Sequence, residues 1–239
     1  MPDFASVPYE LFSRDAAIAI ALREWRLFGQ PVRDELPGTR IIPEDEIPMR
    51  QEGLWQRVGE YWWLGQDAGT APARWTGKHD QRGREFPADE DDRHAWSAAF
   101  ISYVMRGAGA GSRFPYAIAH ASYIDAAWRG PLALDADIAV SAQPPERYAP
   151  QPGDLICTSR DTAPPVRFAD LPATSFPSHC DIVVATTMDS LRVIGGNVGA
   201  AVAMKHVPIA GDGKLVGPDG AILDPRYPWF VVLRVRYDR

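Results

Sequence analysis

Residues 96–109 read WSAAFISYVMRGAG, and this stretch decides the fold. Apolar side chains recur there at helical spacing, at Trp96, Ala99, Phe100, Tyr103 and Val104. The opposite side is also apolar, with Ala95, Ala98, Ile101 and Met105, as is typical of a buried helix. Acidic residues 89–92 stand where the helix macrodipole favours negative charge, and Gly107 supplies the end. The sequence therefore predicts a central, buried helix that begins near this acidic run.

Three further helices are expected around this central one. Segment 14–28 repeats apolar residues at helical spacing, with Ser13 as N-cap and Gly29 as stop. The others are expected from about 50 to 64 and roughly over 117–129. Residues 31–48 hold four prolines, which exclude a regular helix or a central strand. Residues 65–92 are predicted to be a long ordered loop. We divide the chain into an N-terminal helix with a proline-rich extension, 1–48, and one domain, 49–239.

After about residue 150 the pattern changes from helix to strand. Short β-rich runs, each bounded by Gly, Pro, Asp or Ser, lie at 155–158, 181–186, 191–194, 200–207 and 230–237. Residues 188–190 join the second and third runs as a tight hairpin. Helices followed by antiparallel strands indicate an α+β domain, with N-terminal helices packed on one face of a C-terminal antiparallel sheet.

Composition argues against several classes of protein. The 239 residues include 25 basic and 31 acidic side chains, and the net charge of −6 disfavours nucleic-acid binding, which needs a basic surface. No run approaches the about 18 apolar residues that a membrane-spanning helix needs. Residues 1–15 lack the basic start and apolar stretch of a secretory signal peptide. For the two cysteines, Cys157 and Cys180, buried free thiols are favoured over a disulfide.

Ser97, His179 and Asn197 form the candidate catalytic set. Ser97 lies in the first turn of the central helix, where unpaired amides favour a nucleophile or an oxyanion. His179 opens a strand and Asn197 follows the next strand, so a hairpin of the two would bring them together at its open end. A hydroxyl, an imidazole and an amide that orients the imidazole are the parts of a catalytic triad. Asp181 shares a strand face with His179 and competes as its orienter, and Asn197 could instead be a left-handed turn residue.

Other side chains are candidates for the walls of a cleft. His120 starts the fourth helix and is expected either beside Ser97 or in the core as a satisfied histidine. Most tryptophans have the spacing of core residues, although Trp96 and Trp75 are candidate groove aromatics. Ser97 itself could be only a small residue at a tightly packed helix start, and His179 could merely cap its strand.

The order of the motifs resembles that of a known group of enzymes. WSAAFISYVMRGAG, PGDLI, SHCDIVV and VIGGNVGAAV follow one another as in the bacterial papain-like cell-wall hydrolases of the CHAP and NlpC/p60 group. More closely, HAWSAAFISYVMR, FPYAIAHASYI, PGDLICTSR, HCDIVV and IGGNV are similar to an uncharacterised bacterial family, the domain of unknown function numbered 2272. This resemblance covers roughly residues 50–237 and implies a papain-like α+β fold.

The resemblance also implies roles for residues by their position. Ser97 stands where the wider group has its nucleophilic cysteine, and a serine hydroxyl must lose its proton to a base during attack. The implied activity is hydrolysis of amide bonds in peptidoglycan, with Ser97 as nucleophile, His179 as base and then acid, and Asn197 as orienter. The expected substrate-binding residues are Trp96, His120 and Asp181. The alternative is a catalytically silent domain that binds cell-wall fragments or a protein partner in the same groove.

No cofactor and no metal are expected. Six acidic and histidine side chains could in principle supply metal ligands, but no HExxH or comparable spacing joins them: His79, Asp80, His94, His120, His179 and Asp181. The expected ligand is a peptidoglycan fragment or a peptide. Because a cell-wall substrate requires export, the sequence leaves both the compartment and the oligomeric state open.

Overall fold

The computed structural model describes residues 11–39, 41–66, 69–130, 137–160, 164–173 and 175–238. Within these residues the α-helices are α1 (Arg14–Leu27), α2 (Leu54–Gly65), α3 (Ser97–Gly107) and α4 (His120–Arg129). The strands are β1 (Val140–Gln143), β2 (Leu155–Ser159), β3 (Ser178–Thr186), β4 (Ser190–Gly195), β5 (Ala203–Pro208) and β6 (Trp229–Val235). They form an antiparallel sheet in the order β1-β6-β2-β3-β4-β5. The prediction of an α+β protein is therefore confirmed.

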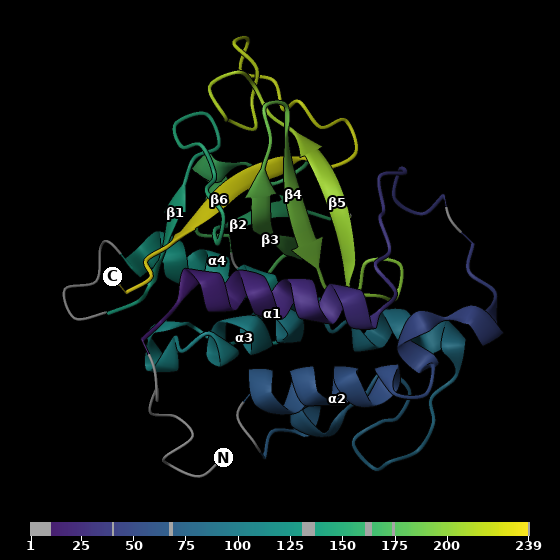
Figure 1. Ribbon diagram of the computed structural model, residues 1–239. Helices are drawn as coiled ribbons and strands as arrows, with labels where there is room; N and C mark the ends of the chain where they lie inside the picture. Colours follow the sequence, from purple (N-terminus) through teal and green to yellow (C-terminus); the bar gives the residue numbers. More distant parts are fainter. Residues whose placement is uncertain are drawn as a thin grey trace.

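The helices gather on one side of the sheet (Figure 1). Helices α1, α3 and α4 contact the strands, and α2 packs against α3 on the side away from the sheet. The main core lies between these layers and includes Phe100 and Val104 of α3 together with Ile182 of β3. Alternate strand residues, such as Ile156 and Val183, face a second apolar cluster on the other side. Side chains of a strand alternate between its faces, and most residues of β2 and β3 are buried because both faces of these strands are covered.

Helix α3 is buried along almost its whole length, as predicted from its apolar pattern. Ser97 lies in its first turn, as predicted, but the acidic run does not belong to this helix. Acidic residues 89–92 lie in a separate 3-10 helix, Ala88–His94, and α3 begins only at Ser97. The two helices are separate because Ala95 adopts a non-helical backbone with ψ of 119°. Ser97 therefore occupies the first turn of α3, with the side chain of Trp96 packed beneath it in the core.

Helix α1 belongs to the same core as the helices that follow it. Ser13 caps it by accepting a hydrogen bond from the amide of Ala16, as predicted. The carboxylate of Glu24, buried within α1, accepts hydrogen bonds from Arg57 at 2.7 Å and from Tyr61 at 2.6 Å, both on α2. A buried carboxylate with two such donors ties α1 to α2. The division of the chain at residue 48 stays a prediction.

Two further features differ from the sequence analysis. The edge strand β1 was not predicted, because four residues with mixed burial are too short to display a period. Cys157 and Cys180 form a disulfide, so the expectation of free thiols was wrong. The two cysteines face each other directly in the β2–β3 pairing. This register depends on the fold and could not be read from their spacing in the chain.

Among the described residues, no helix combines the length and apolar character needed to cross a membrane. Residues 1–10, which include most of the segment inspected for a signal peptide, lie outside the described residues.

Candidate functional site

Polar side chains meet at the end of the sheet where β3 begins and β4 ends. Ser97 is the first residue of α3 and His120 the first residue of α4. His179 is the second residue of β3, and Asn197 comes two residues after β4. Each of these residues lies at the terminus of an element or just beyond it. The hairpin predicted for the two strands is present, with β3 paired antiparallel to β4.

The hydroxyl of Ser97 pairs with His120. Ser97 Oγ lies 2.7 Å from His120 Nε2, and both side chains are buried, with 5% and 3% of their surface exposed. The His120 and His179 rings lie edge to face with their centroids 5.2 Å apart. Of the two histidines, His120 is therefore the one in hydrogen-bond contact with the serine. The base role assigned to His179 from the sequence stays a prediction.

Tyr123 contacts the other nitrogen of the same imidazole. Its hydroxyl is hydrogen-bonded to His120 Nδ1, and the spacing of three residues along α4 places both side chains on one face of the helix. Burial, and secondly the repulsion that a protonated His179 would exert, hold the pKa of His120 well below its ordinary value. His120 is therefore a neutral imidazole at pH 7. Burial raises the pKa of Tyr123, so its hydroxyl keeps its proton.

His179 belongs to a second polar network with Asp181 and Lys205. His179 Nε2 lies 2.9 Å from Asp181 Oδ1, and Lys205 Nζ lies 2.7 Å from Asp181 Oδ2. Burial alone would raise the pKa of Asp181, but Lys205 and His179 outweigh it and hold this pKa well below the usual range. Because an ionised carboxylate only accepts, the proton of neutral His179 is on Nε2. Its Nδ1 then carries a lone pair, and it has no hydrogen-bond partner within the described residues.

Gly195 and Gly196 make room for this arrangement. A Cβ atom at Gly195 would lie 1.8 Å from Asp181 Oδ1 and 2.8 Å from His179 Nε2. A Cβ atom at Gly196 would lie 2.5 Å from the Cβ of Phe100 on α3. Both glycines are therefore required by space: the first admits the His179–Asp181 pair and the second lets the chain approach α3.

Asn197 has properties of both interpretations considered for it. Its backbone is left-handed, with φ of 55°, as expected for a turn residue. Its side chain also lines the cleft beside Ser97 and the neighbouring pocket. No hydrogen bond joins Asn197 to His179 in the described part of the chain, and Asp181 holds that imidazole instead. The roles predicted for Asn197 and Asp181 in catalysis and binding stay predictions.

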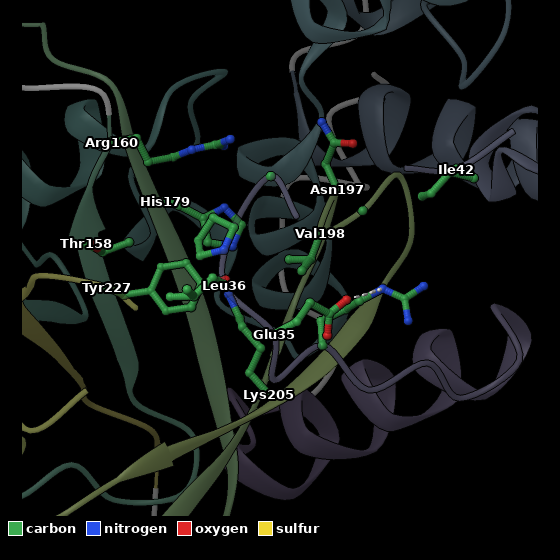
Figure 2. Close-up of a pocket in the computed structure, with 14 residues that line it drawn as sticks. Glu35, Leu36, Ile42, Thr158, Arg160, His179, Asn197, Val198, Lys205 and Tyr227 are labelled. Atoms are coloured by element: carbon green, nitrogen blue, oxygen red, sulfur yellow. Dashed lines mark ion pairs between the residues drawn. The ribbon is translucent and has the colours of Figure 1, made fainter. Parts of the chain in front are cut away.

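Two hollows adjoin the polar cluster. The first, which we call the serine cleft, has a volume of about 530 Å³ and is lined by Ser97 and His120 together with residues 176–178. The second, the sheet-end pocket, has a volume of about 260 Å³ and lies between the sheet and the proline-rich segment after α1 (Figure 2). Arg160, Asn197 and Gly199 line both hollows, so the two adjoin each other at these residues.

Trp96 and Trp75, the candidate groove aromatics, do not present an exposed ring face to a ligand. Trp96 is fully buried, with its indole nitrogen 3.1 Å from Met49 Sδ. Trp75 packs edge-on against Trp62 and His94. A ligand contact by Trp96 would require the core to open, and its predicted binding role stays a prediction.

Three residues of the site were not found from the sequence: Tyr123, Arg160 and Lys205. A lone lysine inside the apolar run 200–207 was a usable signal, since a buried lysine needs a partner of opposite charge. Tyr123 was detectable by its helical spacing from His120. Arg160 follows β2 and carries no local signal.

No group of three or more His, Cys, Asp and Glu side chains in the described residues is arranged to hold a metal ion.

A family of bacterial proteins matches most of the chain. The family described as "Uncharacterized protein conserved in bacteria (DUF2272)" matches residues 49–235, which is most of the chain. No curated protein and no solved structure matches the chain. The resemblance to the CHAP and NlpC/p60 hydrolases, and with it the papain-like fold, therefore stays a prediction.

Proposed function

This chain belongs to the bacterial DUF2272 family, and we propose that it is an amide-bond hydrolase with Ser97 as nucleophile and His120 as general base. The observation that carries the proposal is the distance of 2.7 Å between Ser97 Oγ and His120 Nε2. A nucleophile and a base within about 2.6–3.2 Å of each other are the structural signature of an activated serine. The proposal keeps the nucleophile suggested by the sequence and changes the base.

The neutral state of His120 suits it to this role. For Nε2 to accept the serine proton, Nδ1 must carry the ring proton and donate it to the hydroxyl oxygen of Tyr123. Ser97 Oγ then attacks the carbonyl carbon while its proton passes to Nε2, and the same proton is given to the departing amine. Water next attacks the acyl carbon and loses a proton to Nε2. The bond from the acyl carbon to Ser97 Oγ then breaks, Oγ takes that proton back from Nε2, and a carboxylic acid leaves. General acid–base catalysis of this kind contributes about 10²–10⁴ in rate.

The start of α3 would stabilise the charge that develops on the carbonyl oxygen. The first amides of an α-helix have no partner within the helix, and Ser97 is the first residue of this one. Such donors, fixed in place before the reaction, lower the energy of an oxyanion without reorganising. A helix terminus at the nucleophile thus supports acyl transfer.

Peptidoglycan stem peptides are the substrate class that we propose. This part of the proposal rests on the sequence resemblance to cell-wall hydrolases. It is supported by the Cys157–Cys180 disulfide, because disulfides persist mainly in oxidising compartments outside the cytosol. A domain that binds such peptides without cleaving them is the alternative that the next experiment separates.

The proposal is tested by treating the protein with a fluorophosphonate and measuring its intact mass. We expect one adduct in the wild type and none in Ser97→Ala. Ser102→Ala is the matched control, because Ser102 is also buried on α3 and its Oγ lies 3.4 Å from the Ala117 carbonyl, outside the cleft. This control should be labelled like the wild type. An unlabelled wild type, or a Ser97→Ala variant that still gains the adduct, would contradict the proposal and favour a silent binding domain.

A further inference from the structure

Arg160 stands where the serine cleft and the sheet-end pocket join. It lines both hollows, and Figure 2 shows its side chain extending over the end of the pocket that holds His179 and Asn197. Its guanidinium takes part in no ion pair or side-chain hydrogen bond within the described residues. An arginine between the two hollows can reach a ligand that extends from Ser97 toward the pocket.

The charge of the sheet-end pocket is opposite to that of the whole chain. Arg33, Arg160 and Lys205 line it, against the single carboxylate of Glu35, whereas the chain carries a net charge of −6. Arg33 lies 4.0 Å from Glu35, and Lys205 is paired with Asp181 beneath the pocket. Arg160 therefore supplies positive charge that this pocket does not balance. A hollow with one sign of charge and low-dielectric walls concentrates ligands of the opposite sign.

His179 adds a hydrogen-bond acceptor to the same pocket. Its Nε2 is engaged by Asp181, and its Nδ1, buried and without a partner among the described residues, carries the lone pair. Leaving a buried polar atom unpaired costs about 1–3 kcal/mol, and a ligand N–H would recover part of this cost. The pocket thus offers a cation together with an acceptor for an N–H group.

This pair of groups complements the last residue of a peptide. Such a residue presents an amide N–H and, on the next carbon, a carboxylate. The pocket volume of about 260 Å³ lies just below the roughly 300–1,000 Å³ of sites that enclose a whole drug-sized ligand, so it fits a short arm. Leu36, Pro37 and Ile42 supply apolar wall for the aliphatic part of that arm.

We infer that the sheet-end pocket binds a peptide arm ending in a free carboxylate, which Arg160 pairs with while His179 Nδ1 accepts the adjoining amide N–H. The arm is the portion of the substrate that extends from the carbonyl held at Ser97. This inference deepens the proposed function and rests on it for the position of the reacting bond. It defines the substrate as a carboxylate-bearing peptide.

The test measures binding rather than turnover. Titration calorimetry on Ser97→Ala would compare N-acetyl-dialanine, as both L and D forms, with the matching C-terminal amides. We expect the acid of one form to bind about tenfold more tightly than its amide, since charge-assisted hydrogen bonds of arginine to carboxylate are the strong ones. Methylating the final amide nitrogen should weaken binding by a similar factor, because it removes the N–H offered to His179.

Arginine variants in the same Ser97→Ala background assign the effect. Arg160→Gln should abolish the preference for the acid, and Arg160→Lys should retain part of it. Arg167→Gln is the matched control, since Arg167 is exposed, pairs with Asp170 and lines neither hollow, yet its loss changes the net charge equally. Equal binding of acid and amide, no binding of either, or an unchanged preference in Arg160→Gln would overturn the inference. Because Ser97→Ala cannot turn over, these results stand apart from fluorophosphonate labelling, whose failure would remove only the proposed hydrolysis.

Discussion

Replacing Gly195 by alanine should break the His179–Asp181 pair without touching either residue. The added Cβ would lie 1.8 Å from Asp181 Oδ1, far inside contact distance, so the carboxylate must move or β4 must shift. Asp181 is fully buried and also forms an ion pair with Lys205, which leaves it little space to move. The hydrogen bond of 2.9 Å to His179 cannot survive either movement.

The expected loss of stability follows from three contributions. Losing a hydrogen bond to a charged group costs about 1.5–3 kcal/mol, and overpacking a buried site costs typically about 1–3 kcal/mol. Alanine also restricts the unfolded chain, which offsets about 0.4–1 kcal/mol. The free energy of unfolding of Gly195→Ala should therefore fall by about 2–5 kcal/mol.

Urea denaturation followed by fluorescence measures this change. Gly211→Ala is the matched control, because a Cβ at Gly211 meets no atom within 4 Å. This control should be neutral or slightly more stable. If Gly195→Ala were as stable as Gly211→Ala, the reasoning that space at Gly195 holds the polar network would be refuted.

Three further predictions concern the disulfide, pH and Tyr123. Replacing both Cys157 and Cys180 by alanine should lower the free energy of unfolding by about 3 kcal/mol, because the disulfide spans a separation of 23 residues. A urea midpoint that stays unchanged under non-reducing conditions would contradict this prediction. Burial lowers the pKa of both His120 and His179. Below about pH 6.5 the unfolded chain therefore binds more protons than the native state, and the free energy of unfolding falls on acidification. For the two groups together this fall is at most about 2.7 kcal/mol per pH unit. Urea midpoints that stay constant from pH 7.5 to 5.5 would oppose that assignment. Tyr123→Phe removes the acceptor for His120 Nδ1–H and should slow fluorophosphonate labelling about tenfold. The labelling rate is measured by intact mass against time. An unchanged rate would show that the tyrosine does not orient the imidazole.

The parts of the fold with a clear period were predictable from the sequence. Helix α3 and the strands β2 to β6 repeat apolar residues at the spacing that burial on one or both faces demands. Strand β1 is too short for such a repeat. The acidic run does not start α3, because acidic residues favour the first turn of any helix, and here they favour a separate 3-10 helix.

The only part of the candidate site that the sequence predicts is the part whose position follows from the β3–β4 hairpin. A hairpin necessarily places His179 and Asn197 at its open end, and both line the sheet-end pocket. The contact of Ser97 with His120 depends on how α3 and α4 pack, which no local pattern records. The same holds for Lys205, which reaches Asp181 from β5 across β4.

The central claim is that His120 activates Ser97, and labelling rates of two histidine variants test it most directly. The second-order rate constant for fluorophosphonate labelling would be measured for the wild type, His120→Ala and His179→Ala at pH 7. Loss of a general base predicts a fall of about a hundredfold or more in His120→Ala, and a smaller fall in His179→Ala, whose side chain is bonded to Asp181. A His120→Ala variant labelled at the wild-type rate, with labelling lost in His179→Ala, would contradict the claim and return the base role to His179.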